Sequence, residues 1–359
     1  MNILFLCKRR PQNRDLIERP YGRFYNLPKC LSAMGHQVTL FLGSYKDEPP
    51  EDIKMEGMSV FSRRMFPNIF GFYLEVKELS QILKPDVIVC FSDTWFGIIG
   101  ASIAKTLGAS LVIDAYDNYE AYLPAAKPLH WLWRWSLNRA DALTAAGPQL
   151  LEKLTESNDK ALKAVIPMTA DDLFKPLKMV SCRERLNLPL NNKLVGYAGS
   201  ANKSRGGDVF KEAIKILFAE RNDVDLVVSG RLKISMELPL NRLHDLGYIQ
   251  DDLMPIVLNS CDLLITVNKD SAFGQFSYPI KVYEALACKR QILATDTLPA
   301  RWILKNNEHF LVPFNNARVM AFKIGELLDN PIDVEMLNYD WKDAAYKLER
   351  VLKRVKFEC

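Results

Sequence analysis

Short apolar runs alternate with amphipathic segments along the whole chain. This alternation is typical of parallel βαβ units, in which buried strands are covered by helices. In the first half of the chain it predicts helices over residues 23–34, 98–107 and 147–156, and buried strands over residues 3–7, 37–42, 87–90, 111–113, 140–146 and 164–167. We therefore expect the first half to be an α/β domain.

A polar connector at residues 171–192 carries Pro176 and Pro189, and the alternation restarts after it. Helices are then predicted over residues 207–219, 252–259, 280–287 and 316–328, and strands over residues 194–198, 225–229, 263–267 and 291–294. We expect a linker at 171–192 between domains at 1–170 and 193–335. Two doubly wound sheets would bind a ligand in a crevice at the carboxyl ends of their strands.

Composition supports two domains, because 359 residues with 48% hydrophobic content exceed one compact core of ordinary size. The net charge of +4 is too mild for a dedicated nucleic-acid binder. The basic residues gathered near the N-terminus would attract an anionic ligand or membrane surface, or form a solvated loop; they are Lys8, Arg9, Arg10, Arg14, Arg19 and Arg23.

Seven cysteines without C-x-x-C spacing are interpreted as buried, reduced thiols. The apolar run at residues 3–7 is too short for a signal-peptide core, and no stretch reaches the roughly 18 apolar residues of a spanning helix. We expect a cytoplasmic protein that is soluble or lies against the inner face of the plasma membrane.

The most informative segment is residues 277–296, where Pro279, Lys281 and Glu284 stand at a predicted helix start before a short apolar strand. The free N–H groups of a helix start bind phosphate, and Lys281 adds positive charge. Glu284, one turn later, is placed to accept hydrogen bonds from ribose hydroxyls. The alternative is an ordinary surface helix capped by Ser277.

This segment resembles the Pro-x-Lys-x-x-Glu branch of the retaining glycosyltransferases of family 4. The resemblance implies the GT-B fold, with two Rossmann-like domains facing across a cleft. It also implies a diphosphate site and a nucleoside site in the second domain. The diphosphate residues would be Ser200, Arg205, Ile280 and Lys281, and the nucleoside residues Gly230, Tyr248, Ile249 and Glu284.

Three positions depart from the family's pattern. Ser200 replaces the usual Arg, so Arg205 would carry the charge of the usual basic pair. Phe276 replaces a second glutamate that contacts the donor sugar in many relatives, which leaves the sugar open. Pro279 takes a slot usually held by Gly and removes one N–H from the phosphate site.

In the first half, carboxylates directly follow the strand predicted at residues 111–113. We interpret Asp117 as facing the reaction centre and Asp114 as its catalytic or structural neighbour; helix N-capping by Asp117 or Asn118 is the alternative. The resemblance places Gly22 and Arg23 on the acceptor side. No D-x-D metal site accompanies these residues, and neither a metal nor a cofactor is expected.

Three aromatic groups complete the predictions. Residues 336–359 resemble the family's terminal helix that crosses back to the first domain; Trp341 would anchor this crossing, and the apolar stripe of the helix would pack there. The tryptophans Trp131, Trp133 and Trp135 either belong to a helix core or contact lipid headgroups. The apolar group around Phe70 and Phe72 is assigned to a loop region.

The expected activity is metal-independent transfer of a sugar from a nucleoside-diphosphate sugar to a hydroxyl group of a glycan or lipid-linked acceptor. Retention of configuration and a place in bacterial surface polysaccharide or lipopolysaccharide synthesis follow from the resemblance. Alternatives are a sugar-nucleotide epimerase of the same fold and a non-catalytic partner subunit, and neither nucleic acid nor a cofactor is expected to bind.

Overall fold

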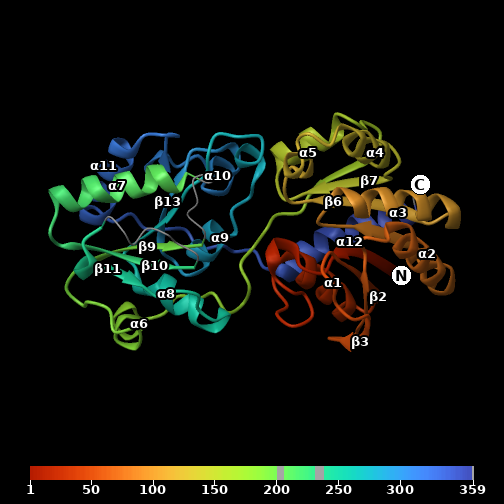
Figure 1. Cartoon of the computed structure of the whole chain (residues 1–359), viewed down its shortest axis with the longest axis horizontal. Coiled ribbons are helices and arrows are strands. Elements are labelled where there is room, and N and C mark those ends of the chain that lie inside the picture. Colours follow the sequence, from red (N-terminus) through yellow and green to blue (C-terminus); the bar gives the residue numbers. More distant parts are fainter. Residues whose placement is uncertain (200–205, 231–237, 358–359) are drawn as a thin grey trace. The chain divides into compact units, whose positions relative to one another are not determined.

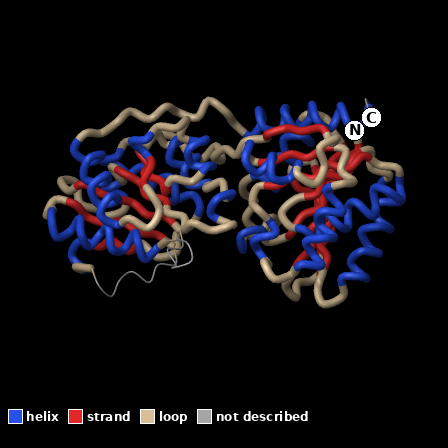
Figure 2. Tube along the Cα trace, turned by 90° about the horizontal axis from the view of Figure 1, so that it is seen from above, coloured by secondary structure: helices blue, strands red, loops and turns tan. Residues whose placement is uncertain are grey.

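The computed structural model describes residues 1–199, 206–230 and 238–357, and it divides into two compact units. The first unit is Met1–Met168 together with the chain from Tyr339 onward, and the second is Thr169–Asn338. The predicted boundaries at 170 and 336 fall close to these limits. In both units strands lie inside and helices outside (Figure 2).

The sheet of the first unit has the strand order β3-β4-β2-β1-β5-β6-β7-β8. All neighbouring pairs are parallel except β3 and β4. The strands are β1 (Asn2–Lys8), β2 (Gln37–Ser44), β3 (Glu51–Met55), β4 (Met58–Arg64), β5 (Val87–Cys90), β6 (Ser110–Ala115), β7 (Ala142–Ala145) and β8 (Leu162–Val165). The hairpin β3–β4 has no counterpart among the predicted elements.

Helices cover this sheet, and residues next to a helix determine where it begins and ends, as α3 illustrates. Asp93 accepts from the backbone of Trp95 at the start of α3, and Gly108 ends that helix in the left-handed conformation. The helices are α1 (Arg23–Ala33), α2 (Ile69–Leu83), α3 (Thr94–Leu107), α4 (Lys127–Leu137), α5 (Pro148–Thr155) and α12 (Trp341–Phe357), with 3₁₀ turns η1 (Pro11–Asn13) and η2 (Tyr119–Tyr122).

The aromatic groups are placed by these helices. Phe72 is buried in α2 whereas Phe70 is exposed, so the segment assigned to a loop region forms part of a helix. In α4, Trp133 is 3% exposed and Trp131 is 71% exposed. The tryptophan run therefore serves both the core and the surface.

Helix α12 belongs to the first unit although it is distant from it in sequence. It lies beside α1, as the blue helix among red and orange elements in Figure 1, and it also packs on β6 and β8. Trp341, Leu348 and Leu352 are buried along one face. The predicted return of the last helix to the first domain is thus confirmed.

The second unit holds a parallel sheet of order β11-β10-β9-β12-β13-β14. Its strands are β9 (Lys193–Ala198), β10 (Val224–Ser229), β11 (Leu243–Asp245), β12 (Leu263–Thr266), β13 (Gln291–Thr295) and β14 (Leu311–Val312). The helices are α6 (Met179–Arg185), α7 (Gly207–Glu220), α8 (Met254–Ser260), α9 (Ile280–Ala287), α10 (Leu298–Ile303) and α11 (Ala317–Asp329). Short 3₁₀ turns are η4 (Leu240–Arg242), η5 (Asp251–Leu253), η6 (Gly274–Phe276) and η7 (Glu308–Phe310).

The predicted linker at 171–192 differs from the structure, which includes these residues in the second unit. They include α6, which packs on α8. Arg183 is buried there, donates to the Ser260 carbonyl at 2.9 Å and pairs with Asp262 at 2.7 Å. Polar residues and prolines indicated a connector, but the buried guanidinium fixes the segment to the domain.

Two further expectations concern chemistry and location. The described cysteines are free thiols and all but Cys30 are buried; burial raises the pKa of Cys7 to about 12. Cys359 lies outside the described residues. No helix in the described part of the chain is both long and apolar enough to cross a membrane.

Candidate functional site

The start of α9 carries the residues that the sequence singled out in the second unit. Pro279 is the N-cap residue and no side chain caps the helix, so Ser277 does not have the alternative capping role. The helix is not a surface helix either, because it buries Val282, Tyr283 and Glu284. Ile280 and Lys281 form its first turn, where backbone N–H groups lack partners within the helix.

Lys281 and Glu284 form an ion pair across one turn of α9. The Lys281 Nζ lies 2.6 Å from the Glu284 Oε2. The Glu284 side chain is 1% exposed and that of Lys281 is 28% exposed. The sequence analysis placed Glu284 near ribose hydroxyls and did not include this pair, which the i,i+3 spacing brings together. An ammonium has three donors, so this pair occupies one of them.

Glycines follow three strands of the second sheet, β9, β10 and β11, and their backbones lie close together. Gly230 follows β10 with φ +109°, and a Cβ there would lie 2.5 Å from the Gly199 carbonyl oxygen. The Gly199 N–H donates to the Ser229 carbonyl at 2.9 Å, and the Gly230 N–H donates to the Gly247 carbonyl at 2.7 Å. Only glycine fits at position 230, and the strand ends present backbone instead of side chains.

The remaining nucleoside candidates follow β11. That strand ends at Asp245, whose carboxylate accepts from the Gly247 N–H at 2.9 Å, so Tyr248 and Ile249 lie beyond a turn. Tyr248 is 70% exposed. Ser200 and Arg205 lie outside the described residues.

Arg23 and Asp114 are paired in the interior of the first unit. The Arg23 Nε donates to Asp114 Oδ1 at 2.7 Å, and Nη1 donates to the Ile166 carbonyl at 2.6 Å. Thr144 donates to Asp114 Oδ2 at 2.5 Å. Burial lowers the pKa of Arg23, but the charge of Asp114 and its hydrogen bonds outweigh burial and raise it. The geometry favours a packing role for both residues.

Gly22 is the N-cap residue of α1 and directly precedes Arg23. Its φ of +66° favours glycine, and a Cβ would meet nothing within 4 Å. Its carbonyl accepts from the Asn26 N–H at 2.9 Å. The backbone at Gly22 therefore aims the buried Arg23 side chain.

Asp117 follows β6 within a group of tyrosines. The Tyr122 hydroxyl donates to Asp117 Oδ2 at 2.8 Å, and Gln12 donates to the Tyr116 hydroxyl at 2.8 Å. Burial, and next the charge of Asp117, raise the pKa of Tyr116 well above its usual value. The N-cap position of η2 is Asn118, without a side-chain capping bond.

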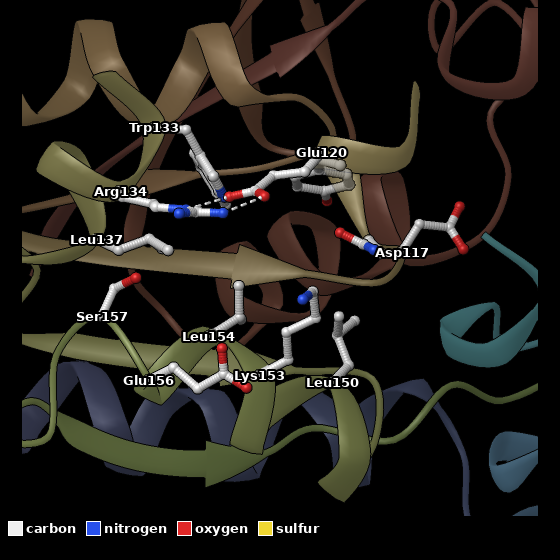
Figure 3. A pocket seen from close by; sticks show the side chains of 12 residues that line it. Asp117, Glu120, Trp133, Arg134, Leu137, Leu150, Lys153, Leu154, Glu156 and Ser157 are labelled. Carbon is white, nitrogen blue, oxygen red and sulfur yellow. Dashed lines mark hydrogen bonds and ion pairs between the residues drawn. The ribbon is translucent and has the colours of Figure 1, made fainter. Parts of the chain in front are cut away.

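A cavity of about 30 Å³ lies next to Asp117, as Figure 3 shows. Arg134 and Glu120 cross it with two hydrogen bonds of 2.8 Å, and the Asp117 carboxylate is directed away from that pair. The volume holds about one water molecule. This cavity is therefore too small for a sugar.

An aromatic cluster at the carboxyl ends of β2, β4 and β5 was missed by the sequence analysis. Tyr45 and Phe66 lie edge to face at 5.0 Å, and Phe66 and Trp95 at 6.1 Å. The Lys8 Nζ lies 4.1 Å from the centre of the Tyr45 ring, and the Tyr45 hydroxyl donates to Asp93 at 2.9 Å. The sequence does hold a signal for this cluster, because two charged residues, Lys8 and Asp93, closely follow predicted strands.

The described residues include no group of three or more His, Cys, Asp or Glu side chains arranged to hold a metal ion.

Comparison with known proteins identifies the family. Residues 23–169 match the model of the glycosyl transferase 4-like domain, and residues 181–348 match that of the glycosyl transferases group 1. A search of curated protein sequences gave no significant match.

Solved structures share this fold over the whole length. Sucrose-phosphate synthase from Thermosynechococcus elongatus is 14% identical with a TM-score of 0.74, covering 100% of this chain and 97% of the other. HepE from Anabaena, in complex with UDP-glucose, is 15% identical with a TM-score of 0.71, covering 99% and 98%. A protein assigned as a UDP-N-acetylglucosamine 2-epimerase from Listeria monocytogenes is 16% identical with a TM-score of 0.66, covering 100% and 97%. With two consecutive family models spanning most of its length on a fold of this type, the chain belongs to the group 1 glycosyltransferases of the GT-B fold.

Proposed function

We propose that this glycosyltransferase moves a sugar, with retention of configuration, from a nucleoside-diphosphate sugar to a hydroxyl group of a glycan or lipid-linked acceptor. The observation that carries the proposal is the Lys281–Glu284 pair at the start of α9. HepE, which has the same fold, was solved with UDP and with UDP-glucose. Retention and a place in bacterial surface polysaccharide or lipopolysaccharide synthesis rest on the family resemblance.

Lys281 would bind the diphosphate with the donors that Glu284 leaves available. Glu284 fixes the ammonium at the helix start, where the N–H groups of the first turn and the helix dipole also favour an anion. The second carboxylate oxygen of Glu284, Oε1, would accept a hydrogen bond from a ribose hydroxyl. Glu284 then both positions Lys281 and contacts the nucleoside.

Transfer breaks the bond between the sugar's anomeric carbon and the diphosphate oxygen, and the leaving diphosphate takes the bonding electron pair. Lys281 and the α9 N–H groups would stabilise that negative charge as it develops. Because these groups supply the positive charge, the proposal needs no metal ion. The acceptor oxygen forms the new bond to the anomeric carbon, and its proton passes to the leaving diphosphate.

The acceptor would be recognised by the first unit. Tyr45, Phe66 and Trp95 are partly exposed and form an apolar surface that suits the C–H face of a sugar ring. Lys8 and Asp93 add polar groups for its hydroxyls. Asp117, held by Tyr122, is proposed to face the acceptor, whereas Arg23 and Asp114 would support the site by packing.

Peripheral membrane contact is proposed for α4 and α2. Trp131 and Phe70 are 71% and 67% exposed, and aromatic side chains of this kind bind at the lipid interface. Trp131→Ser should weaken binding to phosphatidylglycerol vesicles, and the buried-face variant Trp133→Phe should not. Equal vesicle binding by wild type and Trp131→Ser would contradict this contact.

The experiment that tests the proposed function incubates the protein with UDP-, GDP-, dTDP- and CMP-sugars and follows the sugar. A transferase should release the nucleotide and, with an acceptor, form a glycoside. An epimerase would convert the sugar of the donor into its epimer. This alternative stays in the test because the structural neighbour from Listeria is assigned as an epimerase. A non-catalytic partner subunit would do neither, and either of these two outcomes would overturn the proposal.

A further inference from the structure

A groove of about 280 Å³ lies in the first unit between the outermost strand and the last helix. One wall is the whole of β8, Leu162–Val165. The other wall is the face of α12 that carries Lys347, Arg350, Val351 and Arg354. This groove has no part in the proposed sugar transfer, and all its walls belong to one compact unit.

Strand β8 offers unused backbone hydrogen-bonding groups to this groove. It is the last strand of the sheet, and within the described part of the chain it pairs only with β7. The N–H groups of Leu162 and Ile166 donate towards β7, to Asp141 at 2.8 Å and Ala145 at 2.9 Å. Because alternate residues of a parallel strand bond to opposite sides, the N–H and C=O groups of Lys163 and Val165 point away from β7. They form the edge on which another strand can pair.

The charged side chains around the groove are all positive. Lys163, Lys347, Arg350 and Arg354 line it, and no acidic residue does. Within the described residues, the side chains of Lys163 and Arg350 make no ion pair or hydrogen bond. Two cations of α12 that do not line the groove are paired, Lys353 with Glu349 at 2.8 Å and Lys356 with Asp86. Lys163 and Arg350 thus place positive charge, without a partner in the described part of the chain, beside the strand edge.

These features together decide the class of occupant. A second copy of the chain pairing through β8 would bring two sets of these cations together, which is unfavourable. A membrane surface would be bound through Trp, Tyr or Phe side chains, and none lines the groove. We propose that this groove binds an extended, acidic segment of a partner protein, which adds a strand to β8 and places its carboxylates against Lys163 and Arg350.

The test measures binding of a fluorescent peptide of about eight residues that alternates glutamate and valine, a length suited to one strand. One control peptide replaces glutamate by glutamine, and another keeps the charge but carries a central proline, which cannot form a ladder. Vesicles of phosphatidylglycerol and phosphatidylcholine are the membrane probe. Hydrogen exchange at the Lys163 and Val165 amides reports strand pairing directly.

The groove variant is Lys163→Gln with Arg350→Gln, and the control variant is Lys342→Gln with Lys353→Gln. The control removes the same charge from exposed positions that do not line the groove. The peptide should protect both amides, and the groove variant should weaken its binding about tenfold while the control variant changes it less than about threefold.

Four outcomes would overturn the proposal. The glutamate–valine peptide does not bind, or the proline peptide binds equally well, or both pairs of substitutions weaken peptide binding equally. The fourth is that vesicles bind and lose binding in the groove variant while the peptide protects neither amide, which would assign the groove to a membrane surface.

Discussion

Arg23, the first residue of α1, and Asp114, near the end of β6, share two hydrogen bonds in the interior of the first unit. The same guanidinium reaches the Ile166 carbonyl, just after β8. One side chain therefore ties the first helix to two strands that are distant in sequence. The sequence analysis placed Arg23 on the acceptor side and interpreted Asp114 as a catalytic or structural neighbour of Asp117, and the surroundings of both residues favour a structural role.

Arg23→Met should reduce the free energy of unfolding by about 3–5 kcal/mol, because it leaves the Asp114 carboxylate buried without its charge partner. Urea denaturation measures this loss. Arg64→Met is the matched control, since Arg64 pairs with Asp47 on the surface and should cost less than about 1 kcal/mol. A stable Arg23→Met protein with a raised acceptor KM would instead assign Arg23 to the substrate.

Gly230→Ala should weaken nucleotide binding and destabilise the second unit, because its Cβ would lie 2.5 Å from the Gly199 carbonyl oxygen. Gly247→Ala is the control. Its φ of +61° costs about 1–2 kcal/mol in a non-glycine residue, but a Cβ there meets nothing within 4 Å. Thermal unfolding and calorimetric titration should separate the two variants. Equal effects would refute the close backbone packing at Gly230.

Leu348→Ala should cost about 2–5 kcal/mol of stability, since the side chain is fully buried between α12 and the rest of the first unit. Tyr346→Ala, on the exposed face of the same helix, should change stability by less than about 0.5 kcal/mol. Limited proteolysis of the first unit is a second measurement. If Leu348→Ala left stability and proteolysis unchanged, α12 would not be an integral part of that unit.

The contribution of Glu349 to stability should depend on pH. Hydrogen bonding from Lys353 lowers the pKa of Glu349, and His36 adds to this against the effect of burial. A lowered folded-state pKa stabilises the protein above the unfolded value of about 4.3, and this stabilisation is lost as the pH falls through the folded value. Wild type should therefore lose more stability than Glu349→Gln between about pH 7 and pH 3.

Urea denaturation across this range checks the prediction, with Glu78→Gln as the control for an exposed glutamate. The pH profile of Glu78→Gln should follow that of wild type. Parallel profiles for wild type and Glu349→Gln would show that the contacts of Glu349 with His36 and Lys353 contribute nothing to the pH dependence of stability.

The alternation of apolar runs was sufficient to predict most of the sheets and the α9 helix. It missed the β3–β4 hairpin, because β3, with the sequence EDIKM, is an edge strand whose charged residues face water. It also assigned α6 to a linker, because seven residues with little apolar periodicity are held by the tertiary contacts of Arg183. Local pattern carries no information on such contacts.

The candidate site likewise has a part that the sequence could predict and a part that it could not. Lys281 and Glu284 were found because their spacing on one helix is local. Other contacts join residues from separate strands and helices, so no local spacing predicts them. They are the Arg23–Asp114 pair and the cluster of Tyr45, Phe66 and Trp95. These contacts exist only once the sheet is formed.

The most direct test of the donor site is calorimetric titration of Lys281→Ala with a nucleoside diphosphate and with the corresponding nucleoside, using the base that the sugar-nucleotide panel selects. Lys289→Ala, at an exposed lysine just after α9, is the control. Lys281→Ala should weaken diphosphate binding by about 1.5–3 kcal/mol and leave nucleoside binding nearly unchanged. Equal losses for both ligands would contradict the assignment of α9 as the diphosphate site.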